Sequence, residues 1–451
     1  MGLQHTVEIE KMVYGGSGMG RINGKVVFVP FTAPGDRLQV EVTQEKKDFV
    51  EALGTQLITP SPLRTQPFCS LFGKCGGCQY QHLAYSDQLK IKEEILKESL
   101  RRLTKEDGCE IFPILPSSHD RGYRIRVQLK GGQCKGKEVL GFYGPKTHQV
   151  VDVQECALLH PLANQILRNL REWLGGKREK FWIQGANLQV SPDEGKGVMA
   201  LHVEGNVNAA SAEMLGMANP VCKGVVIENK QKIIWGEVFL VYNGSAAPEQ
   251  KALKIAADYK SFTQVNPFQN ENLTRKLIEW SGLTGKEKVL DLYCGSGNLS
   301  LPLAQWALRV WGVDQDPAAI TYARKNALGN YLDNTTFLTG TAQDGIKKVL
   351  TEAQAVDLAV LDPPRAGAGE ILNSLALLCP RKILYVSCEP PTLIRDLVRL
   401  RRLGYHLIRI QPLDMFPHTY HIEVIAELSK GLQGSRGKNK NLKQNTDRGG
   451  E

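Results

Sequence analysis

The chain has 451 residues, of which 42% are apolar and 23% charged, and it carries a formal net charge of +9. This length predicts roughly two to four domains. No apolar run approaches the ~20 residues that a membrane span needs, and the N-terminus lacks a signal-peptide pattern, so we expect a cytoplasmic protein without a membrane partner. The positive charge favours a polyanionic partner such as a nucleic acid, although the basic residues 429–451, an expected disordered tail, contribute to it.

Residues 6–59 alternate short β-type runs with turns rich in glycine and proline, which predicts a small β-barrel over residues 1–60. Its turns carry a characteristic set of small and turn-forming residues: Gly16, Gly18, Gly20, Pro30, Pro34, Gly35 and Asp36. With these residues the segment resembles the TRAM domain, an OB-like barrel, and the resemblance implies RNA binding. A barrel without a ligand is the alternative.

Residues 61–260 are expected to form a cysteine-containing loop followed by a β-rich central domain with a helix near 159–174. Before the central strands, leucines and isoleucines recur at helical spacing over residues 86–103, and Ser86 is a suitable N-cap. We expect one amphipathic helix there, which could pack on the C-terminal domain. That domain, residues 261–428, alternates β-type runs with helical patterns and predicts a doubly wound, Rossmann-like α/β sheet.

A nucleoside-containing cofactor is indicated by two features of this sheet. In residues 289–298 a strand runs into a turn with Gly295 and Gly297, where missing side chains let the backbone approach a ligand. Asp314 ends the next strand, where a carboxylate can bind both ribose hydroxyls. A dinucleotide would prefer a G-x-G-x-x-G turn, whereas D-x-x-C-G-S-G resembles the first motif of class I S-adenosylmethionine methyltransferases, so we favour the methyl donor.

The ends of the next two strands indicate the reaction. Asp362-Pro363-Pro364-Arg365 closes the third strand, and Arg365 stands where enzymes that methylate exocyclic amines carry an aromatic residue. Carbon 5 of uracil, by contrast, becomes reactive only after a thiolate adds to carbon 6. Cys388 follows the fourth strand and precedes an expected helix, whose N-terminus should lower the thiol pKa.

The proton on carbon 5 must then leave, which requires a general base. Candidates lie in residues 416–423, namely His418, His421 and Glu423. This segment, together with YVSCxPxTL and DPPR, resembles the RNA (uracil-5-)-methyltransferase family of the TrmA and RumA type. The resemblance implies that Cys388 is the nucleophile and Glu423 the base. Cys294 is the rival nucleophile, and the two histidines are alternative bases.

The resemblance extends from residue 6 to about residue 428 and implies a set of S-adenosylmethionine contacts: Gln264, Tyr293, Asn298, Asp314 and Asp362.

The chain departs from the family at three positions. Asp314 replaces the usual Glu but keeps the carboxylate. Thr341 replaces Asp or Asn and weakens the expectation of an adenine contact there. Glu389 replaces the Asn that follows the nucleophile, and it places a negative charge beside the thiol.

Cys69, Cys75 and Cys78 lie in one short, glycine-containing loop whose spacing can wrap a metal centre. The spacing alone fits a four-thiolate zinc site nearly as well as an iron-sulfur cluster. The family resemblance favours a [4Fe-4S] cluster and implies Cys156 as its distant fourth ligand.

These features predict a monomeric enzyme that methylates carbon 5 of a uridine in RNA. Barrel and four-cysteine set together resemble bacterial enzymes acting on 23S rRNA, because the tRNA-directed relatives are expected to lack both. A tRNA substrate is the first alternative. The second is a catalytically silent RNA-binding or ribosome-assembly protein.

Overall fold

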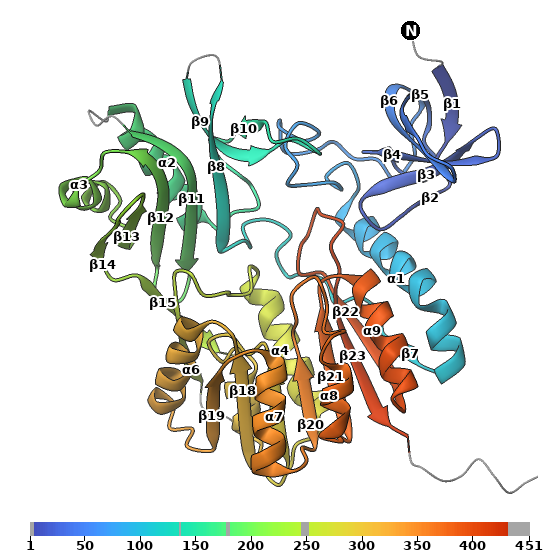
Figure 1. The fold of residues 1–451 in the computed structure, drawn as a ribbon. Helices are drawn as coiled ribbons and strands as arrows, with labels where there is room; N and C mark the ends of the chain where they lie inside the picture. Colours follow the sequence, from blue (N-terminus) through green and yellow to red (C-terminus); the bar gives the residue numbers. More distant parts are fainter. Residues whose placement is uncertain (1–3, 135–136, 177–180, 245–251, 432–451) are drawn as a thin grey trace, which may run out of the picture.

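The N-terminal strands close into a barrel in the computed structural model, which describes residues 4–134, 137–176, 181–244 and 252–431 (Figure 1). The strands are β1 (Gln4–Glu8), β2 (Lys11–Met12), β3 (Ser17–Ile22), β4 (Lys25–Pro30), β5 (Arg37–Glu45) and β6 (Phe49–Thr59), in the order β1-β5-β6-β4-β3-β2. The two ends of this order, β1 and β2, are separated by only two residues of chain, so the sheet curves round on itself. Val27, Val29 and Val40 fill its interior, as the alternating pattern predicts.

The central region is a seven-stranded sheet in the order β10-β9-β8-β11-β12-β13-β14. Its strands are β8 (Arg126–Cys134), β9 (Lys137–Tyr143), β10 (Val150–Asp152), β11 (Phe181–Ser191), β12 (Lys196–Gly205), β13 (Cys222–Glu228) and β14 (Lys232–Gly236). Helices α2 (Pro161–Gly176) and α3 (Ala209–Ala218) bury their apolar side chains in a core shared with the sheet. The hairpin of β15 (Phe239–Gly244) and β16 (Leu253–Asp258) links this region to the C-terminal sheet.

The C-terminal sheet has eight strands in the order β19-β18-β17-β20-β21-β23-β22-β7. They are β7 (Glu110–Ile111), β17 (Lys288–Leu292), β18 (Arg309–Asp314), β19 (Thr335–Thr339), β20 (Leu358–Leu361), β21 (Lys382–Ser387), β22 (Tyr405–Leu413) and β23 (Glu423–Lys430). β17 to β21 run parallel, and β23 is antiparallel to both of its neighbours. The predicted doubly wound α/β fold is confirmed.

Helices lie on both faces of this sheet (Figure 1). They are α4 (Pro267–Ser281), α5 (Ser300–Ala304), α6 (Pro317–Gly329), α7 (Ala342–Ala353), α8 (Leu372–Leu377) and α9 (Pro390–Arg402). None of the described helices is long and apolar enough to cross a membrane. β23 includes residues 429 and 430 of the expected tail, so the tail assignment began too early, and residues 432–451 lie outside the described part of the chain.

Residues 85–111 precede the central sheet in the sequence but lie on the C-terminal sheet in space. α1 (Tyr85–Asp107) buries Leu96 and Leu100 in a core that also holds Leu397 of α9, and β7 adds the last strand of the sheet. The helix begins at Tyr85, after an N-cap residue that makes no side-chain cap, so Ser86 lies inside the first turn and the predicted N-cap was wrong. Burial of the apolar face fixes this helix.

Candidate functional site

The carboxyl ends of the parallel strands bring the predicted residues to one edge of the sheet. Tyr293 follows β17, Asp314 ends β18, Asp362 follows β20, and Cys388 follows β21. Because parallel strands end on the same side, residues up to about 100 positions apart in the chain meet there.

A cavity of about 580 Å³ opens at this edge between the hairpin β15–β16, the start of α4 and the glycine turn after β17. Predicted cofactor residues line it: Gln264, Tyr293, Asn298 and Asp362. The glycine turn follows Tyr293, whose φ is 68°, and it uses φ values of 54° at Gly295 and 94° at Gly297. The positive φ values at positions 295 and 297 favour glycine, because a residue with a Cβ rarely adopts them.

Side-chain amides organise this cavity. The Gln264 amide donates to the Asp362 carboxylate at 3.4 Å. Asn298 and Asn270 exchange a pair of amide hydrogen bonds of 2.8 and 2.9 Å, and Asn270, on the first turn of α4, also lines the cavity. Asn270 was not predicted, since no motif singles out one polar residue at the start of a helix.

Asp314 is not among the residues that line this cavity. Its carboxylate accepts hydrogen bonds of 2.9 Å from the backbone N–H groups of Gly295 and Asp316. It therefore anchors the glycine turn directly. Thr341, whose identity weakened the expected adenine contact, caps α7 by accepting from the Asp344 N–H.

Cys388 and Glu423 come together through strand register. Ser387 at the end of β21 is paired with Val424 of the antiparallel β23. Cys388, which follows Ser387, and Glu423, which precedes Val424, are therefore neighbours across the two strands. On the other side, β20 and β21 pair Leu361 with Tyr385, just before Asp362. Three neighbouring strands thus place one thiol and two carboxyl groups at the edge of the cofactor cavity.

Burial dominates the electrostatics of these three groups. The Glu423 side chain is buried, and burial together with the negative charge of Asp362 raises its pKa well above the ordinary value. Burial raises the pKa of Asp362 to about 7. Two carboxyl groups in such a place resist simultaneous ionisation, and each becomes a stronger proton acceptor than a solvent-exposed carboxylate.

The pKa of the Cys388 thiol is raised to about 12, first by burial and then by the Glu423 carboxylate. Asp362 and Glu389 raise it further, whereas the Arg365 guanidinium lowers it. We expected the N-terminus of α9 to lower this pKa, but the net shift is upward, because burial and three carboxyl groups outweigh the Arg365 guanidinium.

The alternative bases and the rival nucleophile have other surroundings. His418 bonds through Nδ1 to the Gln88 amide and through Nε2 to the Asp120 carboxylate, at 3.1 and 3.2 Å. Burial lowers the pKa of His421 to about 3, and its Nε2 lies 3.3 Å from Arg365. Cys294 is buried on the cofactor side, where burial raises the pKa of its thiol well above the usual value.

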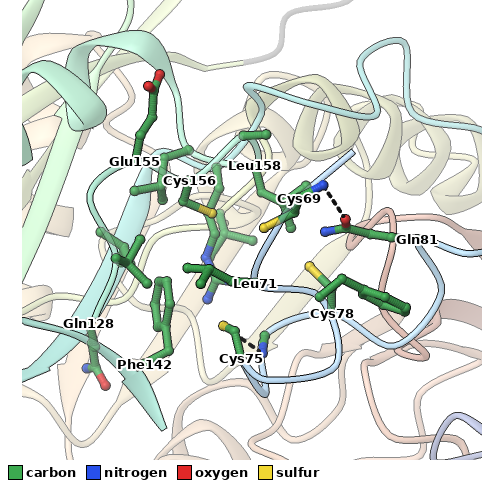
Figure 2. Close-up of a pocket in the computed structure, with 18 of the residues that line it drawn as sticks. Cys69, Leu71, Cys75, Cys78, Gln81, Gln128, Phe142, Glu155, Cys156 and Leu158 are labelled. Carbon is green, nitrogen blue, oxygen red and sulfur yellow. Dashed lines mark hydrogen bonds between the residues drawn. The ribbon is translucent and has the colours of Figure 1, made fainter. Parts of the chain in front are cut away.

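The four predicted metal-binding cysteines surround a second cavity, of about 480 Å³, between the loop before α1 and the central sheet. Cys69, Cys75, Cys78 and Cys156 turn their sulfur atoms toward the same space (Figure 2). The Cys69 N–H donates to the Gln81 side chain at 3.2 Å, and the Gly77 N–H donates to the Cys75 sulfur at 3.4 Å. Sequence segments nearly 80 residues apart therefore meet at this cavity.

These thiols are poor isolated acids. Burial raises the pKa of Cys78 to about 12, and it also raises the pKa of Cys75 and Cys156. For each of these three, neighbouring cysteines add to the increase. Within the described ranges, no three His, Cys, Asp or Glu side chains are arranged to hold a single metal ion.

A buried ion pair supports the loop that leads to Glu423. Lys92 of α1 donates to the Asp414 carboxylate at 2.6 Å and to the Phe416 carbonyl at 3.1 Å, and both charged side chains are fully buried. Gln88, one helical turn earlier, accepts from the His418 N–H. Sequence reasoning missed both residues, although a lysine next to Ile91 on an apolar helix face was a usable signal.

Comparison with known proteins gives a consistent pattern. Residues 224–430 match the family model described as tRNA (uracil-5-)-methyltransferase, and residues 6–63 match the one described as the TRAM domain of tRNA (uracil(54)-C(5))-methyltransferase. An uncharacterized RNA methyltransferase of Clostridium tetani is 34% identical over 91% of this chain and 93% of its own. One from Thermosynechococcus vestitus is 35% identical, over 94% and 97%.

A solved structure also resembles this chain over almost its whole length. It is the tRNA (uracil-54, C5)-methyltransferase of Pyrococcus abyssi in complex with S-adenosyl-L-homocysteine, with a TM-score of 0.70 and 28% identity, covering 94% of this chain and 100% of the other. The barrel therefore does not separate rRNA-directed from tRNA-directed enzymes. The expectation that tRNA-directed relatives lack it was wrong.

Proposed function

This chain belongs to the family of RNA (uracil-5-)-methyltransferases with an N-terminal TRAM domain, and from that premise we propose that Cys388 and Glu423 carry the methylation of a uridine at carbon 5. The observation that supports these roles is the strand register that places a thiol and a buried carboxyl group side by side at the edge of the cofactor cavity. Neither residue lines that cavity, but Asp362 lies in it and acts electrostatically on both.

The cavity fits S-adenosylmethionine, which supplies an electrophilic methyl group when bound. Gln264, Tyr293, Asn298 and Asp362 offer two amides, an aromatic ring and a carboxyl group to a polar nucleoside with a charged tail. Asp314 supports the glycine turn and retains carboxylate lone pairs for a ribose, because each of its oxygens accepts one backbone hydrogen bond.

Cys388 releases its proton to water and its thiolate adds to carbon 6 of the uracil, which moves an electron pair onto the enolate and makes carbon 5 nucleophilic. Arg365 stabilises the thiolate. Carbon 5 takes the methyl group as the sulfur–methyl bond of the donor breaks, with S-adenosylhomocysteine as the leaving group, and Glu423 then removes the remaining proton from carbon 5. The electrons of that bond restore the double bond between carbons 5 and 6 as the sulfur leaves. The raised pKa of Glu423 makes its carboxylate an effective acceptor.

A Cys388→Ala variant tests this mechanism against labelled methyl donor and unmodified cellular RNA. We expect methyl transfer to be lost while binding of the donor persists. RNA substituted with 5-fluorouridine should trap the parent protein covalently, because fluorine cannot leave as a proton does, and should not trap the variant. Retained methylation in the variant would refute the assignment of Cys388. Failure of the parent protein on all RNA would favour the catalytically silent alternative.

We propose that the RNA is 23S rRNA. Because the barrel also occurs in tRNA-directed enzymes, this proposal rests on the four-cysteine set alone. tRNA is the second candidate, favoured by what the comparisons name. Mapping 5-methyluridine in rRNA and tRNA from cells with and without this protein distinguishes the two. Such an enzyme would work in the cytoplasm, where both RNAs are found.

We also propose a [4Fe-4S] cluster bound by Cys69, Cys75, Cys78 and Cys156. The pKa values of Cys75, Cys78 and Cys156 are raised by burial and by neighbouring cysteines, and a bound cationic centre would stabilise these thiols as thiolates. The observation that supports the proposal is that all four thiols line one cavity of about 480 Å³, and the family resemblance favours iron and sulfide over zinc there. Iron and acid-labile sulfide should fall in Cys156→Ser and persist in Cys222→Ser, a buried cysteine of the central core. Stoichiometric zinc without sulfide would refute the cluster.

A further inference from the structure

The turn between β2 and β3 seats the barrel directly on the loop that precedes Glu423. Gly15 and Gly16 have φ values of 100° and 88°, and the Gly16 N–H donates to the Val13 carbonyl at 3.2 Å. A Cβ at Gly16 would lie only 2.9 Å from the Cβ of Gln79 and 3.5 Å from that of Tyr420. Glycine at this position therefore allows the close approach of the barrel to the catalytic domain.

Tyr14, in this turn, reaches into the catalytic domain. Its ring meets the ring of Tyr420 edge to face, with centroids 5.4 Å apart and an interplanar angle of 89°. Its side chain packs against the core that holds α1 and α9. The Tyr14 hydroxyl is buried and makes no hydrogen bond of standard distance and angle within the described chain, although the Glu389 carboxylate lies close enough to accept one. A buried donor without an acceptor costs free energy, so this hydroxyl calls for an explanation.

Glu389 faces this hydroxyl from the other side of the junction. Its carboxylate raises the pKa of Tyr14, after burial, and it also raises the pKa of Tyr420 and of Cys388. Glu389 is the N-cap residue of α9, yet its side chain does not cap the helix. The buried Tyr14 hydroxyl and the Glu389 carboxylate, which leaves its helix uncapped, are therefore near each other and near the Cys388 thiol.

We propose that Tyr14 is a positioning residue of the methyl-transfer pocket, whose hydroxyl donates to the Glu389 carboxylate and holds its charge away from Cys388. The docked barrel then sets the reactivity of the thiol as well as contacting RNA. Glu389 stands where the family resemblance leads us to expect Asn. Its negative charge raises the pKa of Cys388, which a neutral amide would not do. The inference rests on the proposed role of Cys388.

Four variants test the pairing: Tyr14→Phe, Glu389→Gln, the double variant, and Tyr80→Phe as a matched control. Tyr80 also has a buried hydroxyl without a partner in the described residues, and burial and Tyr420, not Glu389, raise its pKa. The readout is the rate at which iodoacetamide modifies Cys388 in the intact protein without RNA or methyl donor. Phenylalanine keeps the ring contact with Tyr420, so unfolding midpoints should change little.

Tyr14→Phe should slow the modification of Cys388 by about threefold to tenfold, since a released carboxylate disfavours the thiolate. The same substitution in the Glu389→Gln background should change nothing, and neither should Tyr80→Phe. Equal effects of Tyr14→Phe in both backgrounds, an effect as large in Tyr80→Phe, or no effect at all would overturn the proposal. Methylation assays run in parallel distinguish failure of the Tyr14–Glu389 pairing from failure of the proposed function. A parent protein without turnover refutes the proposed function, whereas the modification rates of the variants still test the pairing.

Discussion

Modification of Cys388 by iodoacetamide across a pH series tests the electrostatics of the site. The thiol has a pKa of about 12, against an ordinary value of 9.0, so its thiolate fraction at neutral pH is about a thousandfold lower than that of an ordinary thiol. A more basic thiolate is a better nucleophile, and a Brønsted coefficient of about 0.4–0.5 recovers roughly 16- to 32-fold. Cys388 should therefore react about 30- to 60-fold more slowly than an ordinary thiol.

The assay follows each cysteine-containing peptide by mass spectrometry between about pH 7 and pH 10. Exposed Cys379 provides a reference within the same molecule. The Cys388 rate should rise with pH throughout the series without reaching a plateau. The groups that face the thiol are Glu423, Asp362 and Glu389, which hold its pKa up, and Arg365, which lowers it.

Substitutions of these groups should move the rate in opposite directions. Glu389→Gln removes one carboxylate and should speed modification at a given pH, whereas Arg365→Met removes the guanidinium and should slow it. A rate for Cys388 in the parent protein that matches Cys379 and levels off near neutral pH would refute this reasoning. It would mean that the N-terminus of α9 controls the thiol after all.

Three further predictions follow from buried groups. Glu423→Gln should lower turnover about 10²- to 10⁴-fold while the covalent enzyme–RNA adduct accumulates on denaturing gels; unchanged turnover would exclude it as the base. Lys92→Met should cost about 3–5 kcal/mol in urea unfolding, because Asp414 stays buried without its partner, whereas exposed Lys90→Met should cost less than about 1 kcal/mol. Burial raises the pKa of Asp291 to about 7, so the folded state of the parent protein loses stability as the pH rises from about 4 to 7. Asp291→Asn lacks this titration, and in the same urea assay its free energy of unfolding should rise relative to that of the parent protein by up to about 4 kcal/mol over this interval.

The sequence predicted the local elements and the motifs that end them. Short β-type runs between glycine- and proline-rich turns identified the barrel, and β-type runs alternating with helical patterns identified the parallel strands. Glycines at the turn after β17 marked the expected cofactor edge. The spacing of Cys69, Cys75 and Cys78 marked a shared site that the structure assembles with Cys156. Such signals are readable because periodicity, turn chemistry and ligand spacing are short-range properties of the chain.

The tertiary structure determined how deeply the residues of these motifs are buried and which charged groups lie next to them. It added β7 to the edge of the C-terminal sheet, buried Lys92 beside Asp414, and set the barrel residue Tyr14 against Tyr420 of the catalytic domain. It also reversed the expected direction of the Cys388 pKa. Burial and charge at one atom depend on groups from the ends of several strands and from a separate domain, and no local pattern in the sequence adds those contributions together.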